Sequence, residues 1–547
     1  MLIPTKKPRR TTGPGRDLQP DSSTPTRRPS AWVLGVLLFA LLMIVYMANG
    51  TVQFGNDATS NVHLPLQVLE HRSVFFTPEQ NPHMFTYQFR TPTGARYGRI
   101  RDWNAAYEGG TLLSALRRGD LTLVNSYYYL VPTQQSGKYA NTFGLGAGLV
   151  ALPVFAAVKP FVPSLEQRID IQWQLGKVVA AAAVAVSAVF LFLAALARLP
   201  WPAAFLLAVA YGTGTCVWST SSQALWQHGP CELFLAMGAY FLLRKGQRYA
   251  DTLCGLSLGL AVFCRPTMVL VVLSTILFHA LTDRRRLLRF ILGGLPVSAV
   301  VLAYSWYAFG NPLAFGQLAG GAIAQAKTGN PDLWQTPLYL GAAGLLLSPG
   351  RGMLVYSPIV IFAFWGMVRM FRDPEWKDLR PLALGAVALF LMSCKWFDWW
   401  GGWCFGYRPI VDISVLLAFA SLPIVDRVRS ARFLQVGFAV LLCWSVVVQV
   451  IGAIAYDVEG WNGRNVFDVT LPGTGERVTF DDKESAVRQV HDHGGRVESR
   501  SLNIDVPENR KRLWSVTDSP IFYYLGNFSA ASQNRRKRME EFLRIDG

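Results

Sequence analysis

Two acidic residues in the segment after the first apolar run have the chemistry of a general base. Asp57 lies a few residues beyond that run, in Gly55-Asn56-Asp57-Ala58, and Asp102 lies further along, after Arg101. A carboxylate held beside a bilayer under a loop can remove the proton of an acceptor hydroxyl. The structural alternatives are that Asp57 starts a helix as its N-cap and that Asp102 forms a local ion pair.

Four cations have positions that suit the binding of an anion such as a phosphate. Arg265 separates two short apolar runs, Arg351 follows Ser-Pro-Gly at the start of another, and Lys395 and Arg408 enclose a tryptophan-rich segment. A guanidinium can donate two parallel hydrogen bonds to a phosphate, so three outward arginines favour a phosphate-binding site. The alternative is that these side chains extend to lipid headgroups.

The segment between Lys395 and Arg408 combines aromatic rings, glycines and charges. It contains Asp398, Trp399, Trp400 and Trp403. Flat rings beside cations suit a sugar or a lipid phosphate, and we therefore expect these residues to bind the sugar or its acceptor. The alternative is an aromatic belt at the membrane interface.

His228 is the remaining polar candidate, two residues before a proline at a predicted helix start. It is a candidate for sugar or acceptor binding, and the alternative is a structural role. No recognisable metal or nucleotide motif accompanies it: the seven cysteines lack metal-ligand spacing, and the glycines of Gly144–Gly148 lack the following Lys-Ser/Thr of a phosphate loop.

The composition indicates which elements must position these residues. Of 547 residues, 51% are apolar and only 16% are charged, and the mean hydropathy is +0.25. Apolar blocks of about 18 to 25 residues recur along most of the chain, as in a polytopic membrane protein. The formal net charge of +17 comes from short Lys and Arg clusters between these blocks, which fits positive-inside topology and speaks against nucleic acid as a partner.

The basic clusters and apolar blocks together predict eleven crossings of the bilayer, with the N-terminus inside and the C-terminus outside. The expected fold is therefore an all-α polytopic membrane domain over residues 31–455, in the inner (plasma) membrane. The predicted spans are 31–49, 172–197, 202–220, 229–244, 251–264, 266–282, 289–309, 352–371, 380–396, 408–425 and 431–455. The alternative for residues 251–282 is one broken hairpin.

Other segments do not fit as membrane spans. A disordered basic tail over residues 1–30 is expected in the cytoplasm. External loops are expected over 50–171 and 310–351, the second with an interfacial helix over Leu338–Leu347. Residues 456–547 alternate β-like runs with charged stretches and predict a small external α+β appendage.

The order of several short blocks resembles a bacterial GT-C glycosyltransferase, the multi-span class that includes protein O-mannosyltransferases and the aminoarabinose transferase of lipid A. The resemblance covers about residues 31 to 410. The blocks are Asn56-Asp57, Lys138-Tyr139-Ala140-Asn141 before Pro153, Trp226-Gln227-His228, Arg265-Pro266-Thr267, Gly310-Asn311-Pro312, Ser348-Pro349-Gly350-Arg351-Gly352, Tyr356-Ser357-Pro358, Trp399-Trp400-Gly401-Gly402 and Phe405-Gly406-Tyr407-Arg408.

The resemblance implies a polyprenyl-phosphate-sugar donor, an external acceptor and a catalytic acid in the first loop, which by position is Asp57. The family often has a second acid or a metal-associated pair there, but Ala58 follows here, which leaves the involvement of a divalent metal open. A Pro-Pro pair common in related loops is replaced around Thr142–Gly144.

The sequence therefore favours transfer of a sugar to the hydroxyl of a glycan, lipid or protein on the external side, with inversion at the anomeric carbon. The alternatives are a lipid or oligosaccharide transporter without chemistry, an assembly protein of the envelope, and an O-antigen-ligase-like enzyme with a diphosphate donor. A transporter is expected to show internal repeats and charges along a path through the bilayer, and neither is present in the sequence.

Overall fold

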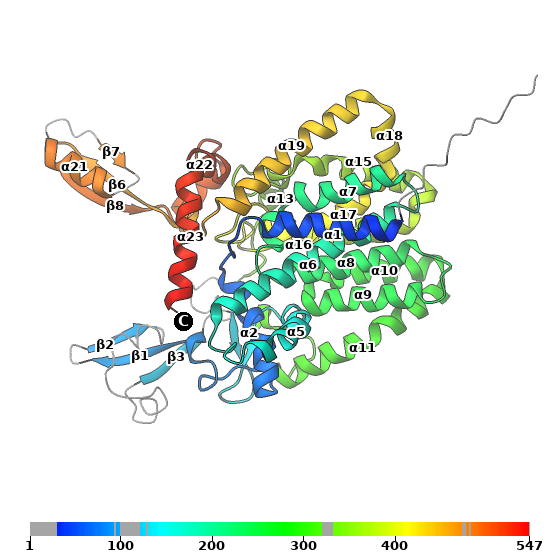
Figure 1. Ribbon diagram of the computed structural model, residues 1–547, viewed down its shortest axis with the longest axis horizontal. Helices are drawn as coiled ribbons and strands as arrows, with labels where there is room; N and C mark the ends of the chain where they lie inside the picture. The colour runs from blue at the N-terminus through cyan, green and yellow to red at the C-terminus, as the bar shows by residue number, and fades with distance from the viewer. Residues whose placement is uncertain are drawn as a thin grey trace, which may run out of the picture.

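The computed structural model describes residues 30–91, 94–98, 121–126, 129–319, 332–472, 477–480 and 483–545. In these residues the chain is mostly helical, and its long helices lie side by side in one bundle (Figure 1). The bundle consists of α1 (Ala31–Met47), α6 (Ile169–Ala195), α7 (Trp201–Gly214), α8 (His228–Leu243), α9 (Ala250–Cys264), α10 (Val269–Thr282), α11 (Arg284–Phe309), α15 (Ile361–Arg372), α16 (Arg380–Lys395), α17 (Ile413–Ala420) and α19 (Arg432–Ile454).

Each predicted span contains helix, but three of the predicted helices are interrupted. After α7 the chain forms a π-helical turn over Val217–Ser221. The span predicted from residue 352 divides into α14 (Met353–Tyr356), a 3-10 turn from Pro358 and then α15, and the span predicted from residue 408 begins with a 3-10 turn before α17. Proline lacks a donor and disfavours a helical residue before it, which accounts for the two breaks at prolines.

The start of α11 also differs from the prediction, because it lies within the basic cluster rather than after it. Asp283 caps the helix, and its carboxylate accepts hydrogen bonds from the backbone N–H groups of Arg285 (2.9 Å) and Arg286 (3.3 Å). Arginine is a good helix former, so the helix extends beyond the apolar run.

Residues 251–282 form two helices, α9 and α10, with the break at Arg265 between the two predicted segments. Arg265 has an extended backbone between them (φ −146°, ψ 107°), and Pro266 begins the next turn. The two helices lie side by side in Figure 1. The turn at Arg265 therefore presents this side chain at one end of the bundle.

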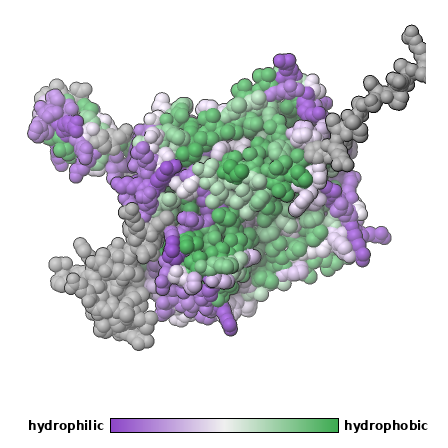
Figure 2. Space-filling model, in the orientation of Figure 1, coloured by the Kyte–Doolittle hydropathy of each residue, from purple (hydrophilic) through white to green (hydrophobic). Residues whose placement is uncertain are grey.

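Three helices in the described chain are long and apolar enough to cross a membrane: α6, α11 and α19. The flank of α11 is exposed through large apolar side chains, among them Leu288, Leu292 and Leu295. Figure 2 shows apolar residues over the side of the bundle and hydrophilic residues gathered at its two ends. A contiguous apolar surface of this kind is typical of a protein in contact with lipid.

Small residues allow neighbouring helices to approach closely. An added Cβ at Gly255 of α9 would lie 1.9 Å from the carbonyl oxygen of Phe290 in α11, and one at Gly293 of α11 would lie 1.9 Å from that of Thr252. Such reciprocal backbone approach is the small-residue packing found between membrane helices. Substitution of either glycine would force α9 and α11 apart.

Residues between α1 and α6 cover one end of the bundle. They form α2 (Asn56–His71), α5 (Gly146–Val158), a three-stranded antiparallel sheet in the order β2-β1-β3, and the hairpin of β4 (Leu130–Pro132) and β5 (Tyr139–Asn141). The sheet strands are β1 (Phe85–Thr91), β2 (Gly94–Gly98) and β3 (Leu121–Ser126). The short helix α13 (Leu338–Leu347) has the bounds expected from its apolar run.

The residues after α19 combine strands and helices at that same end (Figure 1). A second antiparallel sheet has the order β7-β6-β8, with Val469 of β6 opposite Val478 of β7 and Val497 of β8. The strands are β6 (Asn465–Thr470), β7 (Arg477–Phe480) and β8 (Arg496–Ser501), and the helices are α20 (Gly460–Gly463), α21 (Lys483–His493), α22 (Pro520–Gly526) and α23 (Phe528–Ile545).

Candidate active site

The first part of the candidate site is an ion pair between the first inter-helical segment and the tryptophan-rich segment. Asp57 lies in the first turn of α2, so it does stand at a helix start as the structural alternative expected, although the N-cap itself is Gly55. Its Oδ2 lies 2.7 Å from Nη1 of Arg408, and the two side chains are 23% and 16% exposed. Both charges are therefore shielded but remain reachable from solvent.

Arg408 has two further contacts that fix its direction. Its Nη2 donates a hydrogen bond of 2.8 Å to the carbonyl oxygen of Gly401, and its guanidinium lies 5.1 Å from the ring centroid of Trp226. Gly55 lies against the same ring, because an added Cβ there would be 2.0 Å from Cη2 of Trp226. The glycine thus lets the start of α2, with Asp57, approach Trp226 and Arg408.

A second, more deeply buried cluster adjoins this ion pair. Arg265 forms an ion pair with Asp412, which is 1% exposed, and its Nη2 donates a hydrogen bond of 2.9 Å to the carbonyl oxygen of Pro409. Nδ1 of His228 lies 3.0 Å from Oδ2 of the same Asp412. Because Pro409 follows Arg408 in the chain, the two clusters share one backbone segment.

Three of the predicted site residues besides Asp57 are therefore brought together: His228, Arg265 and Arg408. In this arrangement Arg408 pairs with the partly exposed carboxylate of Asp57. Arg265 pairs with the buried carboxylate of Asp412. Such a set can accept a proton at Asp57 and hold an anion near the two arginines.

Arg351 lies elsewhere, inside the protein. Its side chain has no exposed surface, and its guanidinium donates four hydrogen bonds. The acceptors are the carbonyl oxygens of Trp400 (2.9 Å), Gly350 (2.8 Å) and Gly402 (3.0 Å) and Oδ1 of Asn462 (2.9 Å). The phosphate contact expected for Arg351 has no support in this geometry, because protein oxygens already occupy the donors.

The three tryptophans of the predicted sugar site pack against the protein. Trp399 lies against Gly344 of α13, where an added Cβ would be 2.4 Å from its ring, and its ring centroid is 5.9 Å from that of Trp514. Nε1 of Trp400 donates to Oδ1 of Asp505 (3.4 Å), and Nε1 of Trp403 to Oδ1 of Asn503 (3.1 Å). All three rings thus contact the C-terminal region, which gives them a packing role.

Asp398 and Lys395 flank this packed segment. Oδ1 of Asp398 accepts a hydrogen bond of 3.0 Å from the backbone N–H of Gly402. Burial, with the nearby charge of Asp505 as a smaller cause, raises the pKa of Asp398 to about 7. Lys395 ends α16, and its ammonium forms no salt bridge with an acid of the described chain.

Asp102 lies outside the described residues, so its predicted role stays a prediction. The described residues contain no group of three or more His, Cys, Asp or Glu side chains that could hold a metal ion. The involvement of a divalent metal therefore remains untested.

Asp412 is the residue of the candidate site that the sequence reasoning missed. It lies within the predicted span 408–425 as a lone acid among apolar residues. An ionisable residue inside an apolar span is costly and usually has a specific partner or function, so a signal was present in the sequence. Its partners, Arg265 and His228, come from two other helix ends.

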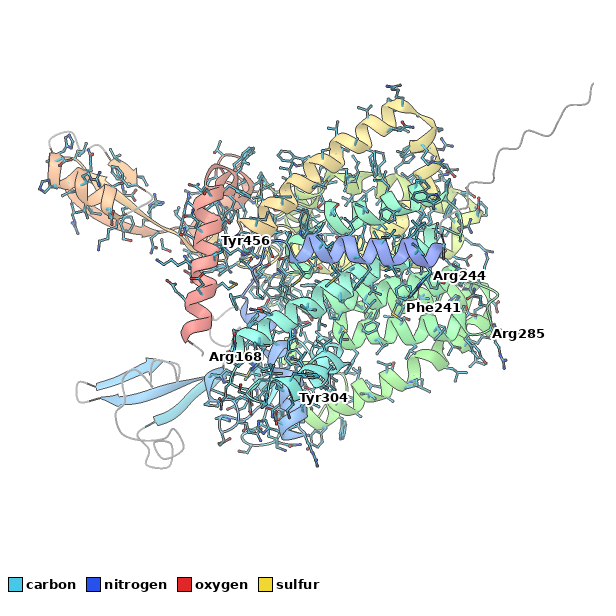
Figure 3. The ribbon with its side chains drawn as sticks, in the orientation of Figure 1. Arg168, Phe241, Arg244, Arg285, Tyr304 and Tyr456 are labelled. Atoms are coloured by element: carbon cyan, nitrogen blue, oxygen red, sulfur yellow. The ribbon has the colours of Figure 1, made fainter. Side chains whose placement is uncertain are left out.

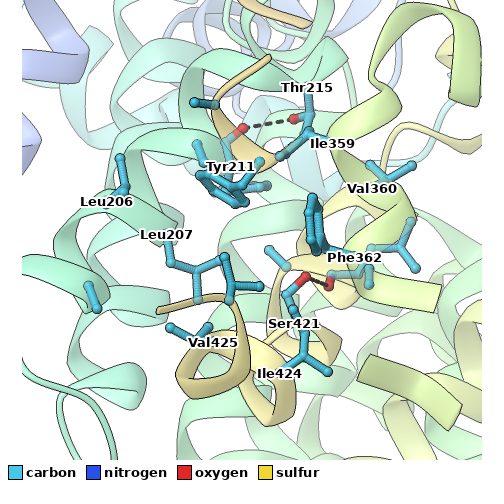
Figure 4. A pocket seen from close by; sticks show the side chains of 18 of the residues that line it. Leu206, Leu207, Tyr211, Thr215, Ile359, Val360, Phe362, Ser421, Ile424 and Val425 are labelled. Carbon is cyan, nitrogen blue, oxygen red and sulfur yellow. Dashed lines mark hydrogen bonds between the residues drawn. The ribbon is translucent and has the colours of Figure 1, made fainter. Parts of the chain in front are cut away.

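An apolar cavity of about 370 Å³ lies between α7, α15, α17 and α19 (Figure 4). Two of its hydroxyl groups are satisfied by backbone carbonyls four residues earlier: Thr215 donates to the carbonyl oxygen of Tyr211 (2.8 Å) and Ser421 to that of Leu417 (3.0 Å). Another lining residue, Ser414, follows Asp412 by two positions. The cavity therefore suits a hydrocarbon chain and lies close in sequence to the charged cluster.

No protein-family model and no curated protein sequence matches this chain.

Proposed function

We propose that this protein is a multi-pass membrane glycosyltransferase that moves a sugar from a polyprenyl phosphate to a hydroxyl of a glycan, a lipid or a protein. The observation that carries the proposal is the partly exposed ion pair of Asp57 and Arg408, with Arg265 and Asp412 beside it. It supplies a proton acceptor next to arginines, the pair of groups that this reaction requires.

In the proposed reaction the acceptor oxygen attacks the anomeric carbon as the bond from that carbon to the phosphate oxygen breaks. The bonding electrons leave with the phosphate, and the acceptor proton passes to the Asp57 carboxylate and then to water. The products are the glycosylated acceptor, with the anomeric configuration inverted, and polyprenyl phosphate. Attack opposite the leaving group accounts for the inversion.

Arg408 has two roles in this proposal. Before donor binding it holds Asp57 at 2.7 Å. The donor phosphate then competes for the same guanidinium, which frees an oxygen of Asp57 to accept the proton of the acceptor. Arg265 stabilises the charge that develops on the leaving phosphate, while Asp412 and His228 orient it.

The apolar cavity supplies a place for part of the polyprenyl chain. Most of the side chains that line it are hydrocarbon. In the bilayer a polyprenyl chain already lies among hydrocarbon, so the cavity would retain it by close packing of its walls against the chain rather than by the hydrophobic effect.

The proposed orientation puts this reaction on the external side of the inner (plasma) membrane. Arg244 and Arg285, from two of the basic clusters, lie at one end of the bundle, and Arg168 and Tyr456 lie at the other (Figure 3). Basic clusters at a helix end favour the cytoplasmic side. The end with α2, and hence Asp57, would then face outward.

Turnover by the purified chain in lipid vesicles tests the proposal. The donors are polyprenyl phosphates that carry different hexoses or pentoses, and the readout is release of polyprenyl phosphate. We expect turnover of one donor class. Transbilayer movement of lipid with no turnover of any donor would favour a transporter instead, and turnover restricted to diphosphate donors would favour an O-antigen-ligase-like enzyme.

A further inference from the structure

A polar cavity in the C-terminal region has no role in the proposed transfer. It has a volume of about 310 Å³ and lies between α20 and the start of β6 on one side and α22 and α23 on the other. None of its lining residues belongs to the candidate active site (Asp57, His228, Arg265, Arg408 and Asp412) or to the apolar cavity. Its volume falls at the lower end of the range of about 300 to 1,000 Å³ that is usual for small-molecule sites.

The charged groups that line this cavity neutralise one another. Nε of Arg538 lies 3.0 Å from Oδ2 of Asp457, and its Nη1 also pairs with Glu459. The other cation of the lining, Arg464, pairs with Asp518 at 3.4 Å and stacks over the ring of Tyr523. A charged ligand would have to displace one of these pairs, whereas a neutral ligand would leave them intact.

The groups that remain available for a ligand are neutral amides. Asn465 and Asn534 are exposed, line the cavity and form no side-chain hydrogen bond within the described chain. Asn527 donates one hydrogen bond of 2.9 Å to the carbonyl oxygen of Tyr523. An amide offers a donor and an acceptor on adjacent atoms, which matches a hydroxyl group that both donates and accepts.

We propose that this cavity binds one neutral sugar unit of a polysaccharide or glycolipid. Three amides, two tyrosines and a balanced charge distribution suit a ligand with several hydroxyl groups and no net charge. An anionic sugar would lie beside Asp457 and Glu459, and a cationic one beside Arg464 and Arg538.

One path of hydrogen bonds ties the cavity to the tryptophan-rich segment. Asn462 lies in α20, between the lining residues Gly460 and Gly463, and accepts a hydrogen bond from Arg351. The same guanidinium donates to Gly402, next to the Gly401 carbonyl that holds Arg408. These hydrogen bonds connect the proposed sugar-binding cavity to the segment that holds Arg408 and, through it, Asp57. Binding of a sugar in the cavity does not depend on the proposed sugar-transfer reaction.

An array of immobilised oligosaccharides tests the proposal on the purified full chain in detergent, without any donor. The probes are neutral oligomers of glucose, galactose, mannose, arabinose and N-acetylglucosamine, with glucuronate-containing and phosphorylated oligomers beside them. We expect at least one neutral oligomer to bind and its affinity to fall about fivefold in Asn465→Ala and in Asn534→Ala, since each change removes one or two hydrogen bonds.

Gln533→Ala is the matched control, because Gln533 is exposed on α23, the helix that carries Asn534, and does not line the cavity. All three variants should melt at the temperature of the unmodified chain. Absence of binding to any neutral oligomer, stronger binding of the anionic ones, or equal affinity in the Asn534→Ala and Gln533→Ala variants would overturn the proposal.

Discussion

The carboxylate of Asp57 and the guanidinium of Arg408 meet at 2.7 Å although 351 positions separate them in the sequence. The contact joins the start of α2 to the segment that follows α16, and Trp226, from the turn before α8, lies against Arg408. The pair is thus assembled from three distant parts of the chain. Its geometry depends on the whole bundle rather than on a local motif.

We expect the two-donor geometry of the Arg408 guanidinium, as well as its charge, to be required for sugar transfer. Arg408 binds Asp57 through Nη1 and the Gly401 carbonyl through Nη2, and a lysine cannot reproduce both contacts at once. We expect Arg408→Lys to lower the rate of sugar transfer by on the order of 10²-fold, because a small misplacement of a reacting group has an effect of that size. The control is Arg168→Lys, which alters an exposed pair with Asp170. Equal rates in the two variants would refute the positioning role.

Removal of the Asp412 charge should destabilise the fold. Asp412 is 1% exposed and pairs with Arg265, which is 14% exposed. Asp412→Asn would leave a shielded guanidinium without its counter-charge, and we expect a loss of about 3–5 kcal/mol. Thermal unfolding of the detergent-solubilised chain measures this effect. An unchanged melting temperature would show that water, rather than Asp412, stabilises the charge of Arg265.

Arg351→Ala should loosen the C-terminal region and leave donor binding unchanged. The change removes four hydrogen bonds from a buried charged group, each worth about 1.5–3 kcal/mol before relaxation. We expect a lower melting temperature and faster proteolysis of the segment after α19. A reduced donor affinity at an unchanged melting temperature would instead restore the phosphate-binding role first expected for this residue.

Asp398 should make stability depend on pH. Burial raises its pKa to about 7 in the folded protein, so the folded state binds a proton more tightly than the unfolded state does. The stability that this proton provides is present at about pH 4 and is lost as the pH rises toward 7.

The Asp398→Asn variant tests this pH dependence, because its side chain keeps the oxygen that accepts from Gly402 but cannot ionise. We therefore expect the fall in melting temperature between pH 5 and pH 8 to be smaller in the variant, by on the order of a few °C. Parallel pH profiles would contradict the assignment.

The apolar cavity should select donors by chain length. Ala418 lines it, and Ala418→Phe would fill part of its volume. We expect the variant to turn over a long-chain polyprenyl donor about tenfold more slowly and a short-chain donor at the original rate, since only the long chain occupies the cavity. Competition between the two donors in one vesicle preparation measures the ratio. An equal loss for both donors would point to a general packing defect.

The positions of the helices were largely predictable from the sequence, because apolar length and basic clusters reflect the demands of the bilayer directly. The helix α13 has the predicted bounds, and α6 and α19 differ from theirs by a few residues. The interruptions near Pro358 and Pro409 were less apparent, since the hydropathy of a predicted span is averaged over a window in which one proline has little weight.

Four members of the candidate site were selected from the sequence, but Asp412 and the pairing of the charges were not. Asp57, His228, Arg265 and Arg408 were selected as polar residues at predicted helix ends, but nothing local indicates that Arg408 pairs with Asp57 or that Asp412 pairs with Arg265. Arg351 and the three tryptophans were selected in the same way, and the structure gives each of them partners inside the protein. Their partners, such as Asn462 and Asp505, come from a C-terminal region whose packing the sequence does not reveal.

Turnover of a polyprenyl-phosphate sugar by Asp57→Asn, beside the unmodified chain, tests the central claim most directly. The substitution keeps the size of the side chain and removes its capacity to accept the proton, and Asp170→Asn at an exposed ion pair is the control. We expect release of polyprenyl phosphate to fall by about 10²- to 10⁴-fold in Asp57→Asn and to stay unchanged in Asp170→Asn. Full turnover by Asp57→Asn would contradict the claim that Asp57 is the base of a glycosyl transfer.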